Sequence, residues 1–185
     1  MRKLKLHMNV SVDGFVSGPN GELDWMTSTG DDLRAIIDQL TDSSDTILLG
    51  RKMTEGFVTY WENEVARGSG WARELGAKMV SMQKVMFSRE VRSAAGKNLR
   101  VENGPLPEAV NALKRQSGKD IVVYGGAGFV SSLIQYALID EYHLFVNPTA
   151  IGNGKRIFGI CTKLDLPASR ACASGVVVNT YITKR

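Results

Sequence analysis

Residues 121–129, which read IVVYGGAGF, decide the fold. The apolar run at 121–124 is typical of a strand buried on both faces of a parallel sheet. Gly125, Gly126 and Gly128 then allow a tight turn, because glycine adopts backbone conformations that other residues avoid. Apolar residues recur after the turn at 129, 130, 133, 134 and 138, the spacing of one helix face. The stretch therefore predicts a strand, a glycine turn and a helix, which is a building unit of α/β proteins.

Similar units precede this stretch along the chain. Alternating or continuous apolar residues predict strands over 3–10, 46–49, 84–88, 99–102 and 141–147. Helical spacing predicts a helix that begins near residue 30 and further helices over 53–61, 71–82 and 106–113. Strands separated by helices need crossover connections, and such connections produce a parallel sheet with helices on both faces.

The end of the chain follows a different pattern. Residues 168–173 and 176–183 are joined through Ser174-Gly175, as expected for an antiparallel hairpin. We therefore predict a three-layer α/β/α fold with a mixed, mostly parallel sheet of about eight strands and a C-terminal antiparallel hairpin. No repeat, low-complexity tract or linker interrupts the chain, so residues 1–185 are expected to form one domain.

The composition excludes several classes of protein. Hydrophobic residues make up 43% and charged residues 23% of the 185 residues, which is ordinary globular composition. No apolar run approaches the roughly 20 residues of a membrane helix, and no signal core follows Met1, so we expect a cytoplasmic protein without a membrane partner. Cys161 and Cys172 match no zinc or redox spacing, so no metal site is expected. The net charge of +4 is mild and no nucleic-acid module is present, so no nucleic-acid partner is expected.

The glycine turn is the strongest functional signal. Without Cβ atoms, Gly125, Gly126 and Gly128 let the backbone approach a pyrophosphate, and the helix that follows directs its positive dipole end at the same place. The segment from Gly125 through Ala127 to Phe129 is therefore a candidate dinucleotide site. The alternative is a tight turn that binds nothing. The motif is not the Rossmann fingerprint, because it comes late in the chain.

Two other predicted strand ends carry groups that suit a phosphate. Gly50 is followed by Arg51, Lys52 and Met53 at the start of a predicted helix, where cations oppose the helix dipole unless an anion lies between them. The alternative is a solvated basic turn. Ser88-Arg89 offers a hydroxyl and a guanidinium after a third strand. Ligands of open α/β sheets bind outside the carboxyl ends of the strands, so we interpret the three segments jointly as one site.

At these residues the chain resembles the dihydrofolate-reductase-like superfamily, in particular the reductase domain of the riboflavin-biosynthesis deaminase-reductases. The similar segments cover nearly the whole chain and are 11–15 (SVDGF), 21–25 (GELDW), 47–54 (ILLGRKMT), 85–89 (VMFSR), 121–128 (IVVYGGAG) and 147–154 (NPTAIGNG). The deaminase half of those proteins, with its His-x-Glu and Pro-Cys-x-x-Cys zinc signature, is absent. The resemblance is therefore to a stand-alone reductase domain.

The resemblance implies a homodimer that transfers hydride from NADPH to a small heterocyclic substrate. A 5-amino-6-(5-phosphoribosylamino)uracil is one such substrate. On this model Arg51, Lys52, Ser88 and Arg89 surround the adenosine 2′-phosphate, residues 125–129 hold the pyrophosphate, and residues 10–18 line the nicotinamide as a mobile loop. Gly50 and Met53 complete the cofactor-binding set. Dihydrofolate-reductase-type activity and a non-catalytic nucleotide-binding protein of the same fold are the alternatives.

The substrate side rests on fewer residues. Dihydrofolate reductases place a carboxylate shortly after a Trp, and Asp32 after Trp25 is the nearest match, so Asp32 is the candidate catalytic acid. The alternative is that Asp31 and Asp32 compensate the dipole at a helix N-terminus. Trp25 and Trp61 are candidates to stack on a flat substrate, although aromatic residues at helical spacing usually belong to the core. No proline follows Trp25 and no counterpart of the folate-tail arginine is visible, which disfavours folate itself.

Overall fold

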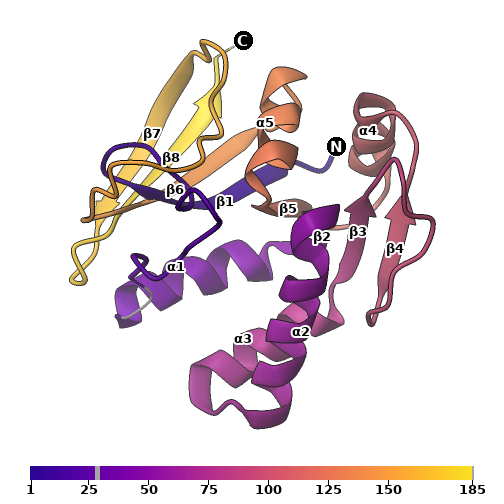
Figure 1. Ribbon diagram of the computed structural model, residues 1–185, viewed down its shortest axis with the longest axis horizontal. Coiled ribbons are helices and arrows are strands. Elements are labelled where there is room, and N and C mark those ends of the chain that lie inside the picture. The colour runs from indigo at the N-terminus through magenta and orange to yellow at the C-terminus, as the bar shows by residue number, and fades with distance from the viewer. Residues whose placement is uncertain (28–29, 185) are drawn as a thin grey trace.

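All eight strands of the protein lie in one sheet (Figure 1), in a computed structural model that describes residues 1–27 and 30–184. The strands are β1 (Leu4–Ser11), β2 (Ser44–Gly50), β3 (Gln83–Phe87), β4 (Leu99–Glu102), β5 (Asp120–Gly125), β6 (Glu141–Asn147), β7 (Leu164–Ala171) and β8 (Val177–Thr183). The helices are α1 (Asp31–Asp42), α2 (Arg51–Arg67), α3 (Gly70–Ser81), α4 (Leu106–Arg115) and α5 (Ala127–Gln135). Within the described ranges, no helix is both long and apolar enough to cross a membrane.

The sheet has the strand order β4-β3-β2-β5-β1-β6-β8-β7. The six strands from β4 to β6 in this order pair in parallel. Helices form the crossover connections except between β3 and β4, which a loop joins. Strand β8 is antiparallel to both β6 and β7. The predicted mixed sheet of eight strands with a terminal antiparallel hairpin is confirmed.

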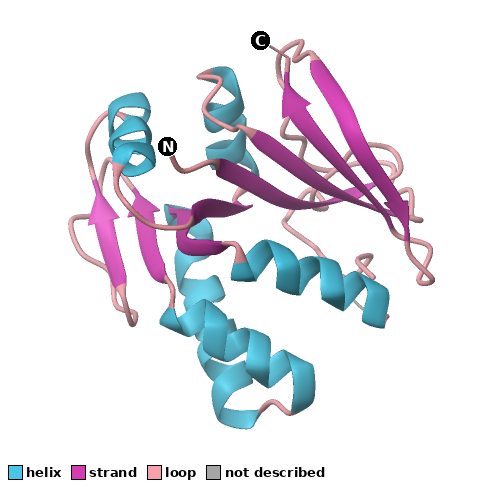
Figure 2. Cartoon of the chain, turned by 180° about the vertical axis from the view of Figure 1, so that it is seen from behind, coloured by secondary structure: helices cyan, strands magenta, loops and turns pink. Residues whose placement is uncertain are grey.

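Helices α4 and α5 cover one face of the sheet and α1, α2 and α3 cover the other, so that the sheet lies between two helical layers (Figures 1 and 2). Strand β5 shows how the core is divided. Ile121 and Val123 pack with Val130 of α5, whereas Val122 packs with Met79 of α3 on the opposite face. Successive side chains of a strand point to opposite faces, so a central strand needs an apolar residue at every position. This explains why residues 121–124 form a continuous apolar run.

Helix α2 and strand β7 differ most from the sequence-based prediction. Helix α2 continues to Arg67, past the predicted end at Trp61, because no helix breaker occurs between Trp61 and Gly68. The prediction ended too early because these additional residues are mostly polar and lack apolar spacing. Strand β7 begins at Leu164 and includes Pro167, within a register irregularity opposite β8. β7 is the edge strand, where proline is tolerated because its missing N–H faces solvent.

Candidate functional site

The three predicted phosphate-binding segments meet at one edge of the sheet. Strand β2 lies between β3 and β5, and all three run in the same direction. Gly50 pairs with Phe87, the residue before Ser88, and Leu49 pairs with Gly125. The carboxyl ends of these strands therefore carry Gly50, Ser88 and Gly125 to neighbouring positions, as the joint interpretation of the segments requires.

Two helices begin side by side at this edge, α2 after β2 and α5 after β5 (Figure 1). Gly50 is the N-cap of α2, and Gly126, with φ +55°, is the N-cap of α5. Neither first turn contains an acidic residue, and no described side chain caps either helix. The first N–H groups of a helix have no acceptor within the helix, and they carry the positive end of its dipole. The edge thus presents two adjacent N-termini that are open to an anion.

Close packing holds these two helix starts together. A Cβ added at Gly50 would lie 2.7 Å from Cβ of Phe129, so only glycine permits this approach. The ring of Phe129 stacks on that of Phe87, with ring centroids 5.3 Å apart and planes inclined by 28°. A Cβ added at Gly128 would meet nothing within 4 Å, so this turn of α5 borders open space.

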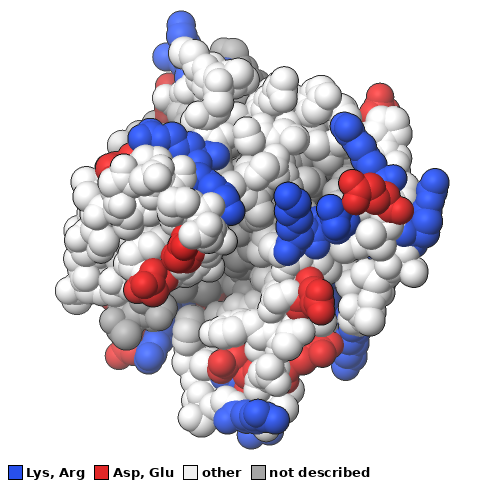
Figure 3. Space-filling model, viewed as in Figure 1, with Lys and Arg blue, Asp and Glu red and all other residues white. Residues whose placement is uncertain are grey.

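Cations and a hydroxyl surround the two N-termini. Arg51, Lys52 and Arg89 are exposed, and Nη2 of Arg51 lies 3.2 Å from Oε2 of Glu90. Ser88 Oγ accepts hydrogen bonds from the backbone N–H groups of Glu90 and Val91, at 3.1 and 2.9 Å, which leaves its own proton available for donation. Figure 3 shows Lys and Arg side chains gathered at the start of α2 and, across a hollow, over the loop that follows β6.

Hydrogen bonds join the segment after β1 to the loop after β6. The backbone N–H of Val12 donates to Thr149 O at 2.9 Å. The Asp13 carboxylate accepts from the backbone N–H groups of Ile151 and Gly152, at 3.2 and 2.7 Å, and from Ser11 Oγ at 2.6 Å. The bond from Ser11 and the two backbone bonds hold the pKa of Asp13 below its ordinary value. Backbone and carboxylate hydrogen bonds thus join residues 10–18 to the loop after β6, and the expected mobility of this segment stays a prediction.

Asn147 organises the same region, although sequence reasoning gave it no role. Its side chain is fully buried. Oδ1 accepts from the backbone N–H of Thr27 at 2.7 Å, while Nδ2 donates to Asn9 Oδ1 at 3.1 Å and to Phe145 O at 2.9 Å. One amide thereby links the ends of β1 and β6 to the segment that precedes α1. The available signal was an asparagine that ends an apolar strand directly before Pro148.

Asp32, the candidate acid, lies in the first turn of α1. Its Oδ1 accepts from the backbone N–H of Leu33 at 2.8 Å, and its Oδ2 accepts from the N–H of Ala173 at 2.7 Å. The bond from Ala173 is the main reason that the pKa of this carboxyl lies below its ordinary value. A carboxylate held in this way stabilises the contact between α1 and the β7–β8 turn. The catalytic role of Asp32 stays a prediction, and this geometry favours the structural alternative.

The two candidate substrate-binding tryptophans occupy different settings. Trp25 is half-buried in the segment between β1 and α1, and its Nε1 donates to Glu22 O at 3.2 Å. Trp61 lies ten residues after Arg51 along α2, roughly 15 Å at 1.5 Å per residue, and packs on the apolar cluster around Leu75 and Met79. Trp25 is therefore held by a local contact, whereas Trp61 packs against the core, and a substrate contact for either residue stays a prediction.

Comparison with known proteins agrees with this arrangement. A model of the RibD C-terminal domain matches residues 2–178. The chain belongs to the RibD C-terminal domain family. YyaP of Bacillus subtilis, a curated relative, is 33% identical over 185 residues, which cover 97% of this chain and 94% of YyaP.

Solved structures share the fold of this RibD C-terminal domain. A protein from Shewanella sp. PV-4 superposes with a TM-score of 0.78 at 18% identity, covering 100% of both chains. A bifunctional deaminase and reductase from Thermotoga maritima superposes with a TM-score of 0.69 at 13% identity, and this chain covers 57% of it. The resemblance to the reductase domain of the riboflavin-pathway proteins is thereby confirmed at the level of family and fold.

Proposed function

We propose that this RibD C-terminal domain is an NADPH-dependent reductase that transfers hydride to a small heterocyclic substrate. One observation carries the proposal. Two uncapped helix N-termini, those of α2 and α5, begin beside each other at the carboxyl ends of neighbouring parallel strands. Open α/β sheets bind ligands at this edge, and two adjacent N-termini suit the two phosphates of a dinucleotide.

The residues present fit the phosphorylated end of NADPH. Residues 125–129 would hold the pyrophosphate on the open N–H groups of α5, next to the space that Gly128 borders. Arg51, Lys52 and Arg89 would contact the 2′-phosphate, with Ser88 Oγ as a further donor. The 2′-phosphate is the one group that NADPH has and NADH lacks, so cations that bind it would produce the expected preference for NADPH.

NADPH, when bound, supplies the hydride, and the protein supplies position and environment. The segment at 10–18 would form one wall of the site, because Asp13 and Val12 bind the loop after β6. Asn147 holds the segment that carries Trp25 against the ends of β1 and β6. These contacts would hold cofactor and substrate together and exclude water, which is the main contribution of a protein to such a reaction.

The substrate class follows from the family. The Thermotoga maritima relative is named a diaminohydroxyphosphoribosylaminopyrimidine deaminase and 5-amino-6-(5-phosphoribosylamino)uracil reductase. We propose a 5-amino-6-(5-phosphoribosylamino)uracil or a related flat heterocycle as the substrate of this chain. Dihydrofolate is the alternative substrate, and nucleotide binding without turnover is the alternative function.

A titration of the purified protein with NADPH and NADH tests the cofactor assignment. Trp25, Trp61 and Trp71 provide fluorescence that bound nicotinamide quenches by energy transfer. We expect micromolar binding of NADPH that is clearly tighter than binding of NADH. NADPH oxidation is then followed with the pyrimidine and with dihydrofolate as substrates. Absence of binding contradicts the reductase assignment, and binding without turnover of either compound supports the non-catalytic alternative.

Assembly into a homodimer is part of the same proposal. Strand β7 forms one edge of the sheet, and its Leu166 has an exposed fraction of 52%. Ile182 on the adjoining β8 is 39% exposed. Apolar side chains that are exposed together are often covered by a partner. Light scattering should give twice the 20.2 kDa mass of one chain, and a mass of 20.2 kDa would contradict a dimer.

A further inference from the structure

A second cavity opens at the opposite edge of the sheet from the proposed cofactor site. Its volume is about 560 Å³, within the range of roughly 300–1,000 Å³ that small-molecule sites occupy. The amino ends of β2 and β3 line it, together with the ends of α3 and α4 and the segment before β5. Strand β2 has seven residues, so roughly 20 Å of strand separates the two edges.

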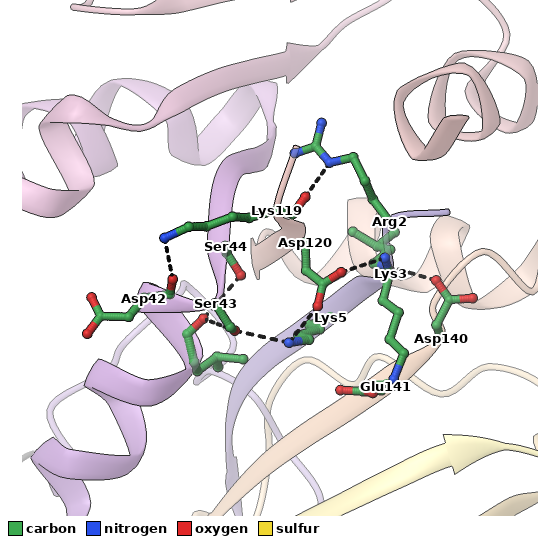
Figure 4. Close-up of polar contacts among 12 residues, drawn as sticks. Arg2, Lys3, Lys5, Asp42, Ser43, Ser44, Lys119, Asp120, Asp140 and Glu141 are labelled. Atoms are coloured by element: carbon green, nitrogen blue, oxygen red, sulfur yellow. Dashed lines mark hydrogen bonds and ion pairs between the residues drawn. The ribbon is translucent and has the colours of Figure 1, made fainter. Parts of the chain in front are cut away.

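Arg2 forms a fixed part of the cavity wall. Its side chain is 7% exposed although it carries a full charge. Nε donates to Lys119 O (Figure 4), and Nη2 donates to Asp45 Oδ1 and, at 2.7 Å, to Thr46 Oγ1. No hydrogen bond joins Nη1 to another described residue. A buried guanidinium held by its other nitrogens thus keeps the two N–H donors of Nη1 for a ligand.

The charges around the cavity favour an anion. Arg2, Arg100 and Lys119 line it together with one acidic residue, Asp45. Nζ of Lys119 donates to Asp42 O at 2.8 Å, so the guanidinium groups of Arg2 and Arg100 are the cations offered to a ligand. Asp45 is already satisfied, because it pairs with Arg2 and accepts the backbone N–H of Lys119 at 2.8 Å. The guanidinium of Arg100 also faces Glu102, at 3.2 Å, and its side chain is 49% exposed, which leaves it free to turn toward a ligand.

Neutral donors complete the lining. Ser81, Gln83, Gln116 and Ser117 contribute hydroxyl and amide groups, which can bind the polar part of an organic anion. Val85 and Leu113 give the cavity an apolar floor. A few polar groups around an apolar base are the usual composition of a small-molecule site.

Two helices, α3 and α4, end at the cavity, and the partial negative charge of a helix C-terminus disfavours an anion. At α3 this charge is offset by the buried Lys84, whose Nζ donates to the carbonyl oxygens of Met79, Val80 and Met82 at 2.8 to 3.0 Å. Burial lowers the pKa of Lys84 to about 8, so the side chain remains mostly protonated at pH 7. The last turn of α4 carries basic residues of its own. The helix ends therefore do not cancel the positive charge of the lining.

We propose that this cavity binds a small organic anion through a phosphate or carboxylate group held by Arg2 and Arg100. The site is distinct from the proposed cofactor site, since it lies at the amino ends of β2 and β3 rather than at their carboxyl ends. Ribose 5-phosphate and succinate represent the two anion classes, and inorganic phosphate represents the bare group. A preference among these three probes identifies the class.

Substitutions at Ser117 test the proposal without disturbing the core, because this residue is exposed in the loop after α4. Ser117→Glu brings a negative charge to the rim, and Ser117→Gln is the matched neutral control. Binding is measured by amide chemical-shift titration of the full chain with each probe. We expect saturable binding with shifts at Asp45, Thr46 and Gln83, weakened about tenfold by Ser117→Glu and retained by Ser117→Gln.

Three results would overturn the proposal. They are the absence of saturable binding for all three probes, shifts centred on Gly50 and Gly125 instead, and equal affinities for Ser117→Glu and Ser117→Gln. The Gly126→Asp variant separates this site from the proposed function. If that variant loses NADPH but still binds the probe, the second site stands independently of the cofactor assignment.

Discussion

The N-terminus of α1 differs from the N-termini of α2 and α5 in how the positive end of the helix dipole is compensated. Helix α1 has Asp31 and Asp32 in its first turn, and the Asp32 carboxylate is bound to backbone N–H groups. Helices α2 and α5 have glycine N-caps, no acid in the first turn and, among the described residues, no capping side chain. Under the proposed function, the anion that α1 supplies for itself comes from the ligand at these two adjacent helix starts. Helix α3 also lacks a first-turn acid and a capping side-chain bond, so it is the adjacency of α2 and α5 that distinguishes them. The predictions below test this contrast.

The largest effect is expected at Gly126, the N-cap of α5. Gly126→Asp places a carboxylate where the pyrophosphate is proposed to bind, so NADPH affinity should fall roughly 100-fold. Gly126→Asn is the matched control, since it imposes the same backbone strain at φ +55° and ψ 116° without adding a charge. We expect the Asn variant to bind far better than the Asp variant, with both folded by circular dichroism. Equal affinities would remove α5 from the cofactor site.

A smaller effect is expected from the cations beside α2. Combining Arg51→Ala with Arg89→Ala should reduce the preference for NADPH over NADH about tenfold, because each lost charge-assisted bond concerns only the 2′-phosphate. Arg67→Ala, at the far end of α2, removes one charge from the same helix and should leave the preference unchanged. Titrations with both cofactors measure the ratio. A preference that survives in the double variant contradicts the 2′-phosphate assignment.

Glu90 should have a weaker influence in the opposite direction. Its carboxylate lies 3.2 Å from the guanidinium of Arg51 and competes with a phosphate for it. Glu90→Gln should therefore tighten NADPH binding by roughly two- to fivefold, the range of an exposed ion pair, with little effect on NADH. Weaker binding of NADPH would show that Glu90 orients Arg51 instead of competing for it.

Asp32 should have the smallest effect on cofactor binding. Asp32→Asn removes a charge at α1, so it should lower the melting temperature while NADPH affinity stays unchanged. Because hydrogen bonds hold the pKa of Asp32 below the ordinary 3.8, its stabilising contribution is present above that pH and is lost as the pH falls through the lowered pKa. The parent should thus lose more stability on acidification than the variant.

Asp31→Asn is the control for this experiment, because the exposed Asp31 has, within residues 1–27 and 30–184, a single ion-pair partner, Arg34, one turn along the same helix. Both variants are also assayed for turnover. A loss of kcat in Asp32→Asn that spares folding, and that Asp31→Asn does not share, would restore Asp32 as the catalytic acid.

Local patterns in the sequence were sufficient to predict the layers and the location of the candidate site. The apolar run at 121–124 required a doubly covered strand, and the glycines after it required a turn into a helix. The groups at Gly50, Ser88 and Gly125 could be joined because parallel strands end at one edge of a sheet. The strand and the turn follow from residues that are neighbours in the chain, and the joint site follows from the general rule for the ends of parallel strands.

Tertiary structure alone decided the contacts between distant segments. The hydrogen bond from Thr27 to Asn147 and the ion pair of Glu90 with Arg51 join residues that are far apart in the chain, so no local sequence pattern predicts them. The continuation of α2 beyond Trp61 and the start of β7 at Leu164 were missed because polar helix residues and an edge-strand proline carry no periodic signal. The sequence determined which faces had to be buried, since burial of apolar side chains follows from their spacing. The fold decided which polar groups then met, since that depends on how the buried faces pack against one another.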